Sequence, residues 1–175
     1  MGHTLNLNDK LAVTAYLMAG VIANAFVTRF GQAGLVVTAL LMIPVDLTVR
    51  DYLHERWERS GALNIKMWTL ILSGALLSYW SSFASREVAI ASCAAFLCSG
   101  AADFFIFKRL RGNTWFVRAN LSNLGSAAVD SFVFPAVAFS VFDVRLCAVQ
   151  TLLKFFGGLV ISNMMAKRMG RPGLW

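Results

Sequence analysis

The sequence predicts an all-α, polytopic membrane protein that forms one domain over residues 1–175, and three observations support this. Hydrophobic residues make up 58% of the chain and charged residues only 14%, and the mean hydropathy is +0.64. A soluble domain is about half apolar and about a quarter charged, so a soluble fold of this size could not bury so much apolar surface. The apolar residues also form long runs, and short basic clusters separate these runs.

Six apolar runs are candidates for transmembrane helices, each of which needs about 20 residues. They cover residues 11–30, 33–49, 63–83, 88–107, 119–142 and 146–165. Only Gly31 and Gln32 separate the first two runs, which predicts a tight helical hairpin. Asp46 interrupts the second run before the polar stretch 50–59.

Lys and Arg are distributed unequally between the two sides that six spans define. Twelve lie on the side of the two termini, three lie in the opposite connections, and Lys154 lies within a span. Because loops on the cytoplasmic side carry the excess of Lys and Arg, we expect both termini in the cytoplasm and the protein in the cell (inner) membrane. The net charge of +7 suits anionic lipid headgroups. Since the basic residues do not follow one face, nucleic acid is not an expected partner.

Two prolines lie at corresponding places in the predicted spans. Pro44 and Pro135 belong to the middle helices of two three-helix halves, and each is near an acid, Asp46 or Asp130. Broken helices at matching places in halves of inverted topology mark the binding site of many transporters. The pattern is compatible with two such halves, although no repeat of residues supports them directly.

Asp130 and Lys154 are the most informative ionisable residues within the spans. Each lies eleven residues from the predicted inner end of its helix, which places both about 16 Å deep, near the middle of a bilayer core of about 30 Å. A charged side chain at this depth costs roughly 2.5–3.5 kcal/mol on insertion scales. The two residues could form a structural ion pair, contact a substrate or proton, or do both.

The fifth span carries the most polar helix face in the chain. Asn123, Ser126, Asp130 and Phe134 recur at spacings of three and four residues, and Ser122 lies near its start. Small and polar residues also mediate helix packing, which accounts for Ser126 better than for Asn123 or Asp130. We therefore expect this face to bind substrate.

Other polar residues admit a structural and a functional interpretation. Gln150 lies one turn before Lys154, and Asn24 is expected to form an interhelical hydrogen bond. Asp46 lies too deep for the juxtamembrane salt bridges expected of the residues that follow it, which are Glu55, Arg56, Glu58 and Arg59. Asp103 could be an acid at a helix end or a site residue.

The sequence gives no indication of an enzyme, a cofactor or a metal site. Cys93, Cys98 and Cys147 lie inside apolar runs without the spacing of metal ligands. The two histidines are His3, near the N-terminus, and His54, on the cytoplasmic side, so no Ser–His pair is expected at membrane depth.

Two stretches of the chain resemble the queuosine precursor transporter family, also called the vitamin uptake transporter family. The first reads Val45-Asp46…Arg50-Asp51…His54-Glu55, and the second reads Arg118-Ala119-Asn120-Leu121-Ser122-Asn123…Asp130-Ser131-Phe132…Phe134. Members have six helices and import 7-cyano-7-deazaguanine or related deazapurines for tRNA modification, and the resemblance implies that function. Many relatives have an Asn-Glu pair where this chain has His54-Glu55, which leaves the exact substrate open.

The resemblance also implies substrate-binding roles for particular residues. In the second motif they are Asp130, Asn123 and Ser122, and in the first they are Asp46, Asp51 and Glu55. Their positions in the spans make Lys154, Gln150, Asn24 and Phe134 further candidates for substrate binding. A carboxylate can accept both N–H groups on one edge of a deazaguanine, and Asn, Gln or Lys can meet its acceptors. The flat ring could lie against Phe132, Phe134 or Tyr52.

The alternative function is the substrate-binding subunit of an energy-coupling-factor vitamin transporter. Such subunits also have six helices, and a stripe of small residues on the first helix docks their partner. Ala15, Ala19 and Ala23 would provide this stripe. The sequence leaves open the energy source and the oligomeric state, which includes a homo-oligomer.

Overall fold

The computed structural model describes residues 7–59, 63–81, 86–139 and 143–170, apart from the side chains of residues 32, 35 and 139. These residues form five continuous helical elements. The elements are α1 (Leu7–Glu58), α2 (Leu63–Ser81), α3 (Arg86–Arg109), α4 (Trp115–Phe139) and α5 (Val144–Arg168). The predicted all-helical fold is confirmed for this part of the chain.

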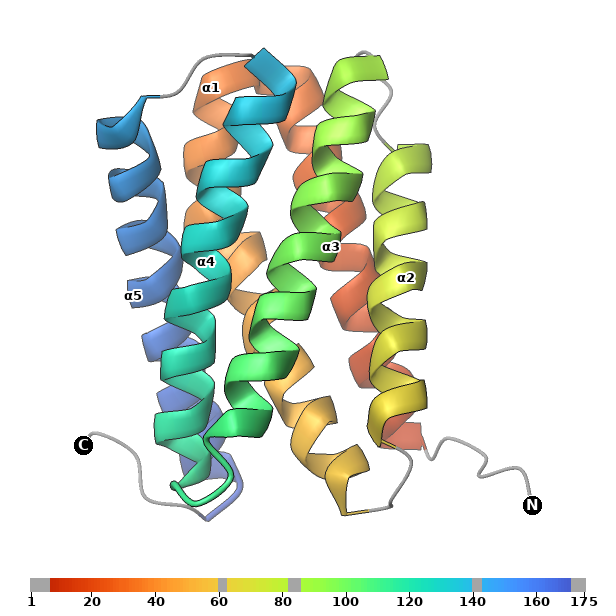
Figure 1. Cartoon of the computed structure of the whole chain (residues 1–175), viewed down its shortest axis with the longest axis vertical. Helices are drawn as coiled ribbons and strands as arrows, with labels where there is room; N and C mark the ends of the chain where they lie inside the picture. The colour runs from red at the N-terminus through yellow and green to blue at the C-terminus, as the bar shows by residue number, and fades with distance from the viewer. Residues whose placement is uncertain (1–6, 60–62, 82–85, 140–142, 171–175) are drawn as a thin grey trace.

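Element α1 consists of two helices joined at Gly31. The dihedral angles of Gly31 are φ 56° and ψ −128°, which lie outside the helical region and in the part of φ space that favours glycine. Three residues later, a Cβ atom on Gly34 would lie only 2.4 Å from the carbonyl oxygen of Phe26. The chain therefore folds back tightly on itself, as Figure 1 shows, and the hairpin predicted at residues 31 and 32 is confirmed.

The six helical segments run alternately up and down beside one another, and both termini lie at one end of the bundle (Figure 1). We call the end with the termini the terminal end. The opposite end contains Gly31, and we call it the turn end.

Four segments are long and apolar enough to cross a membrane by length and composition alone. They are Leu7–Gly31, Arg86–Arg109, Trp115–Ala138 and Val144–Arg168.

The second half of α1 and the 19-residue α2 are not among these four, which were sought in the described residues alone. In the second half of α1, Asp46, Arg50 and Asp51 are 5%, 1% and 0% exposed, so these charges face the interior of the bundle. A six-span crossing therefore stays a prediction for these two segments.

The two prolines do not break their helices. Element α1 continues through Pro44 and α4 through Pro135. A Cβ atom on Gly157 of α5 would lie 2.5 Å from the Pro44 ring and 3.0 Å from the carbonyl oxygen of Leu40. The expectation of broken helices is thus wrong, since Pro44 sits inside a continuous helix against which α5 packs closely.

Large buried side chains gather in the half of the bundle near the terminal end. One cluster joins both halves of α1 to α2 and α3, and it consists of Tyr16, Leu53, Trp57, Leu63, Met67, Leu70, Ile71 and Phe104. A second cluster joins α3, α4 and α5 and consists of Phe107, Trp115, Ala119 and Ala166. These clusters close the terminal end to water.

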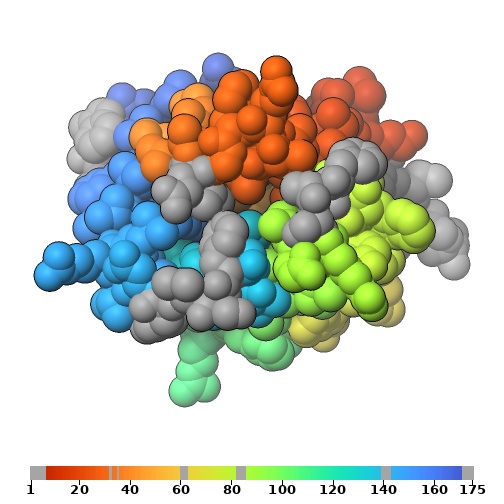
Figure 2. Space-filling view, turned by 90° about the horizontal axis from the view of Figure 1, so that it is seen from above, coloured from red at the N-terminus to blue at the C-terminus, as the bar shows by residue number. Residues whose placement is uncertain are grey.

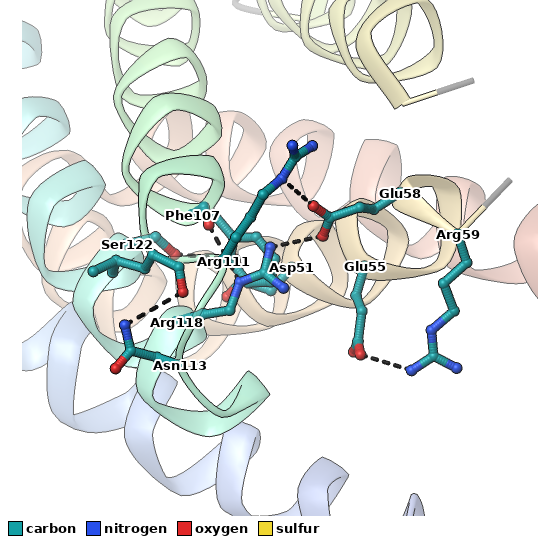
Figure 3. A network of polar contacts seen from close by, with 10 residues as sticks. Asp51, Glu55, Glu58, Arg59, Phe107, Arg111, Asn113, Arg118 and Ser122 are labelled. Carbon is teal, nitrogen blue, oxygen red and sulfur yellow. Dashed lines mark hydrogen bonds and ion pairs between the residues drawn. The ribbon is translucent and has the colours of Figure 1, made fainter. Parts of the chain in front are cut away.

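Glu58 binds two arginines at this end, as Figure 3 shows. One carboxylate oxygen accepts a hydrogen bond from Arg118 at 2.7 Å, and the other pairs with Arg111. Arg118 also donates to the carbonyl oxygen of Phe107 at 3.2 Å and lies 4.0 Å from the centre of its ring. Burial alone would raise the pKa of Glu58, but the two guanidinium groups hold it below its usual range. The salt bridges expected near the membrane surface are therefore present.

We expect Gly34→Ala to lower the free energy of unfolding by about 1–3 kcal/mol, because the new methyl group must displace the backbone at Phe26. The measurement is thermal or denaturant unfolding of the purified protein in detergent. Gly112→Ala is the control, since a Cβ atom there would meet nothing within 4 Å. Equal stability of the two variants would contradict the tight hairpin.

We expect Glu58→Gln to lower Tm at pH 7 by no more than about 4 °C. The pKa of Glu58 is lowered in the folded protein, so its contribution is present above the unfolded pKa of about 4.3 and is lost as the pH falls through the lower folded value. The difference in Tm should therefore shrink as the pH falls below about 4 and should vanish once the pH is below the folded pKa.

The matched control is Glu55→Gln, which removes the pair of Glu55 with Arg59, an exposed i,i+4 neighbour at 2.8 Å. This variant should shift Tm less than Glu58→Gln does. If Glu58→Gln lowered Tm by the same amount at pH 3 and at pH 7, the lost charge of Glu58 would not be the cause of the lower Tm.

Candidate functional site

A cavity of about 70 Å³ lies between the helices, and all five elements contribute to its wall. Small residues of α1, α3 and α4 leave this space: Gly20, Ala23, Ala95 and Ala127. Its polar lining residues are Asn24, Thr38, Asp46, Ser78, Ser92, Ser99, Asp130, Gln150 and Lys154. The cavity extends from the middle of the bundle towards the turn end, as the positions of its lining residues along the helices show. Figure 2 shows the turn end from above, with segments of α1, α3, α4 and α5 around the centre.

Asp130 and Lys154 form an ion pair on the cavity wall. The Nζ atom of Lys154 donates to Oδ2 of Asp130 at 2.6 Å and to the hydroxyl of Ser131 at 2.9 Å. Lys154 is 4% exposed, whereas Asp130 is 22% exposed. The two adjacent helices thus bring their opposite charges together at the same level of the bundle. Asp130 is the partner that remains open to the cavity.

Asp46 and Gln150 line the cavity, and each has one buried side-chain atom without a hydrogen-bond partner among the described residues. These atoms are Oδ1 of Asp46 and Nε2 of Gln150, and the two residues are 5% and 3% exposed. A buried polar atom without a partner costs about 1–3 kcal/mol. An acceptor and a donor beside the cavity therefore have unused hydrogen-bonding capacity.

Asn24 ties three helices together at the edge of the cavity. Its side-chain nitrogen donates to the carbonyl and hydroxyl oxygens of Ser78 at 2.9 and 3.0 Å and to the hydroxyl of Ser81 at 3.0 Å. Its oxygen accepts a hydrogen bond from Ser92 at 3.2 Å. The interhelical role expected of Asn24 is confirmed, and these bonds hold the first half of α1 against α2 and α3.

Two aromatic rings line the same cavity. Phe134 of α4 is one of the site residues predicted from the sequence, and Phe96 of α3 is an addition from the structure. Phe96 also packs edge-on against Tyr16, with ring centres 5.4 Å apart. The other two candidate stacking residues, Phe132 and Tyr52, are not part of the wall.

A buried polar layer lies directly beneath the cavity, towards the terminal end. Arg50, which is 1% exposed, donates from Nε to Oδ2 of Asp103 at 2.9 Å and from Nη2 to Ser126 at 3.2 Å. Beside it, Ser122 donates to Oδ1 of Asp51 at 3.1 Å. Asp51, Asp103 and Ser122 are all 0% exposed.

The predicted site residues therefore separate into three groups. Six lie on the cavity wall: Asn24, Asp46, Asp130, Phe134, Gln150 and Lys154. Asp51, Ser122 and Asn123 lie in or beside the polar layer, where all three are fully buried. Glu55 pairs with Arg59 near the surface of the terminal end, apart from the cavity wall.

The sequence analysis missed the partnership of Arg50 and Asp103. Arg50 was expected in the polar stretch that follows the second span, and Asp103 was expected to be either an acid at a helix end or a site residue, but both are buried in the bundle. Charge balance was the available signal, because an acid within a span requires a nearby cation. Only the packing of α1 against α3 shows which cation that is.

Comparison with known proteins agrees with a membrane transporter. A family model described as "Putative vitamin uptake transporter" matches residues 20–167, a range that contains every residue of the cavity wall. Comparisons with curated proteins and with solved structures gave no significant match. The matched range covers most of the chain, and its apolar helices fit a multi-pass membrane protein. The chain therefore belongs to the vitamin uptake transporter family.

Proposed function

We propose that this protein imports a queuosine precursor, 7-cyano-7-deazaguanine or a related deazapurine, for tRNA modification, and binds it in the cavity. The observation that carries the proposal is the set of polar atoms on the wall. Asp130 is open to the cavity, and Asp46 and Gln150 each have an atom without a partner among the described residues. Family membership supports the uptake of a small molecule. The hydrogen-bonding atoms named above support a heterocyclic base as the molecule that is taken up.

The chemistry of a deazaguanine complements this wall. Its ring N–H and amino group lie along one edge, and a carboxylate can accept both in bidentate fashion. Asp130 or Asp46 would bind this edge, and the amide nitrogen of Gln150 would donate to an acceptor of the ring. Phe96 and Phe134 offer apolar surfaces for the flat ring itself.

The size of the cavity limits the occupant. A volume of about 70 Å³ is far below the roughly 300 Å³ at which pockets for drug-sized ligands begin. A single fused ring system requires less widening of this cavity than a nucleotide or a peptide does. Because Asp130 pairs with Lys154, Asp46 is the lining residue whose carboxyl group has no ion-pair partner on the wall, which suits a ligand that donates hydrogen bonds.

The position of the cavity supports import. With both termini in the cytoplasm, as the distribution of Lys and Arg predicts, the cavity lies in the outer half of the bundle. The large side chains and the Glu58 salt bridges close the opposite end. This conformation would receive substrate from outside, and transport would require the terminal end to open.

The structure gives no support to the alternative, a substrate-binding subunit that docks a partner through the first helix. Ala19 and Ala23 are 5% and 7% exposed and face the interior of the bundle. Of the three alanines in the predicted stripe, only Ala15 is exposed. The small residues thus serve packing within the chain and leave no continuous docking face.

The test is uptake of labelled 7-cyano-7-deazaguanine, read also as queuosine in tRNA, by cells that lack their own transporter and deazaguanine synthesis. We expect Asp130→Asn to reduce uptake roughly 10- to 150-fold, the equivalent of one hydrogen bond to a charged group worth about 1.5–3 kcal/mol. Gln150→Ala should also reduce uptake, without loss of stability, because its Nε2 atom has no hydrogen-bond partner among the described residues.

Asp143→Asn is the matched control for the loss of a carboxylate. Asp143 caps the start of α5 at the turn end, and asparagine caps a helix equally well. Amounts of each variant in the membrane must be equal before rates are compared. Normal uptake by both Asp130→Asn and Gln150→Ala would refute the assignment of the cavity, and no uptake by the unaltered protein would refute the substrate.

A further inference from the structure

Asp51 and Asp103 are neighbours in the polar layer beneath the cavity, where both lie close to Arg50 and Ser122, and Asn123 lies beside Asp51. Ser122 donates to Oδ1 of Asp51 at 3.1 Å, and Arg50 donates to Oδ2 of Asp103 at 2.9 Å. The other oxygen of each, Oδ2 of Asp51 and Oδ1 of Asp103, has no donor among the described residues. Neither side chain is exposed.

Charge balance requires a further positive charge at this place. Arg50 is the one cation with a direct hydrogen bond to the pair in the part of the chain that the structure describes, and Asp46 also lies within its electrostatic reach. Two ionised carboxylates in contact repel each other strongly, and a buried pair of this kind normally shares one proton. A shared proton would also give both unpartnered oxygens a hydrogen bond.

A metal ion is a poorer occupant than a proton. Among the described residues, no group of three or more His, Cys, Asp or Glu side chains is placed to hold a metal ion. The pair itself offers two carboxyl groups and the hydroxyl of Ser122. Hard cations usually bind six or more oxygen atoms, which this layer does not provide.

The surroundings of the pair define a route for the proton. Asp46 lies on the cavity wall one helical turn before Arg50, so water in the cavity comes close to the polar layer. The other ionisable groups facing this layer are Tyr16 and His54 of α1, Arg118 and Asp130 of α4, and Lys154 of α5. Lys66, the single charged residue of α2, lies 5.7 Å from the ring of Trp57 instead.

We propose that Asp51 and Asp103 bind one transported proton between them, and that this protein is a proton-coupled importer. The inference rests on the proposed import function. One proton enters from the cavity side with each substrate molecule, is held by the pair while the terminal end is closed, and leaves to the cytoplasm when that end opens. The carboxyl pair then returns ionised, so the net reaction moves one proton and one substrate inward.

The test uses the purified full-length protein in liposomes, with labelled 7-cyano-7-deazaguanine outside and the membrane voltage clamped. Acidifying the outside by about one pH unit should drive roughly tenfold accumulation of the label, the equilibrium limit for one proton per substrate. Asp51→Asn should retain exchange of external for internal label but lose accumulation, and Asp143→Asn should behave as wild type. Uptake that ignores the pH gradient, or follows a sodium gradient, would overturn proton coupling and leave the import function standing.

A second measurement does not depend on the substrate. Infrared spectra of the wild-type protein at neutral pH should contain the carbonyl stretch of a protonated carboxylic acid. The component of this band that comes from the pair should be missing in both Asp51→Asn and Asp103→Asn, and the whole band should persist in Asp143→Asn. If the wild-type protein lacked this band, the proton site would be refuted, whether or not the protein transports the substrate. If the band were present but no uptake occurred, the proposed import function alone would be refuted.

Discussion

The interior of this bundle depends on one buried guanidinium group, that of Arg50. It donates to Asp103 of α3 and Ser126 of α4, and so joins the second half of α1 to both helices. A charge in an environment of low dielectric constant must be paired, because burying it alone costs several kcal/mol. Arg50 therefore determines where α1 and α3 meet, and it marks the boundary between the cavity and the closed half of the bundle.

The two halves of the bundle differ because their side chains differ in size. Rings and long aliphatic chains such as Trp57, Phe104 and Phe107 fill the terminal half, whereas Gly20, Ala23, Ala95 and other small residues line the cavity half. Lipid supplies no hydrophobic force that would press helices together. Close packing and interhelical hydrogen bonds hold the small-residue half together instead.

The sequence predicted that Asp130 and Lys154 lie at the same level, and it predicted the partners of the other polar residues only in part. Depth follows from counting along a helix at 1.5 Å per residue, so Asp130 and Lys154 could be placed at the same level before their contact was known. The direction in which a side chain points depends on how each helix is rotated, and nothing local determines that rotation. Asp51 and Glu55 illustrate the difference, since one turn of helix separates a fully buried carboxylate from one paired near the surface.

The sequence by itself determined the all-helical membrane class, the hairpin at Gly31, the side of the bundle that carries the basic residues, and the family resemblance that the comparison supports. These follow from composition, from periodicity and from short motifs, all of which act locally. Only the tertiary structure decided that Arg50 pairs with Asp103, that α1 runs unbroken through Pro44, and which polar atoms remain without partners. These features arise from contacts between segments far apart in the chain, and the energy of such contacts depends on packing that no single segment encodes.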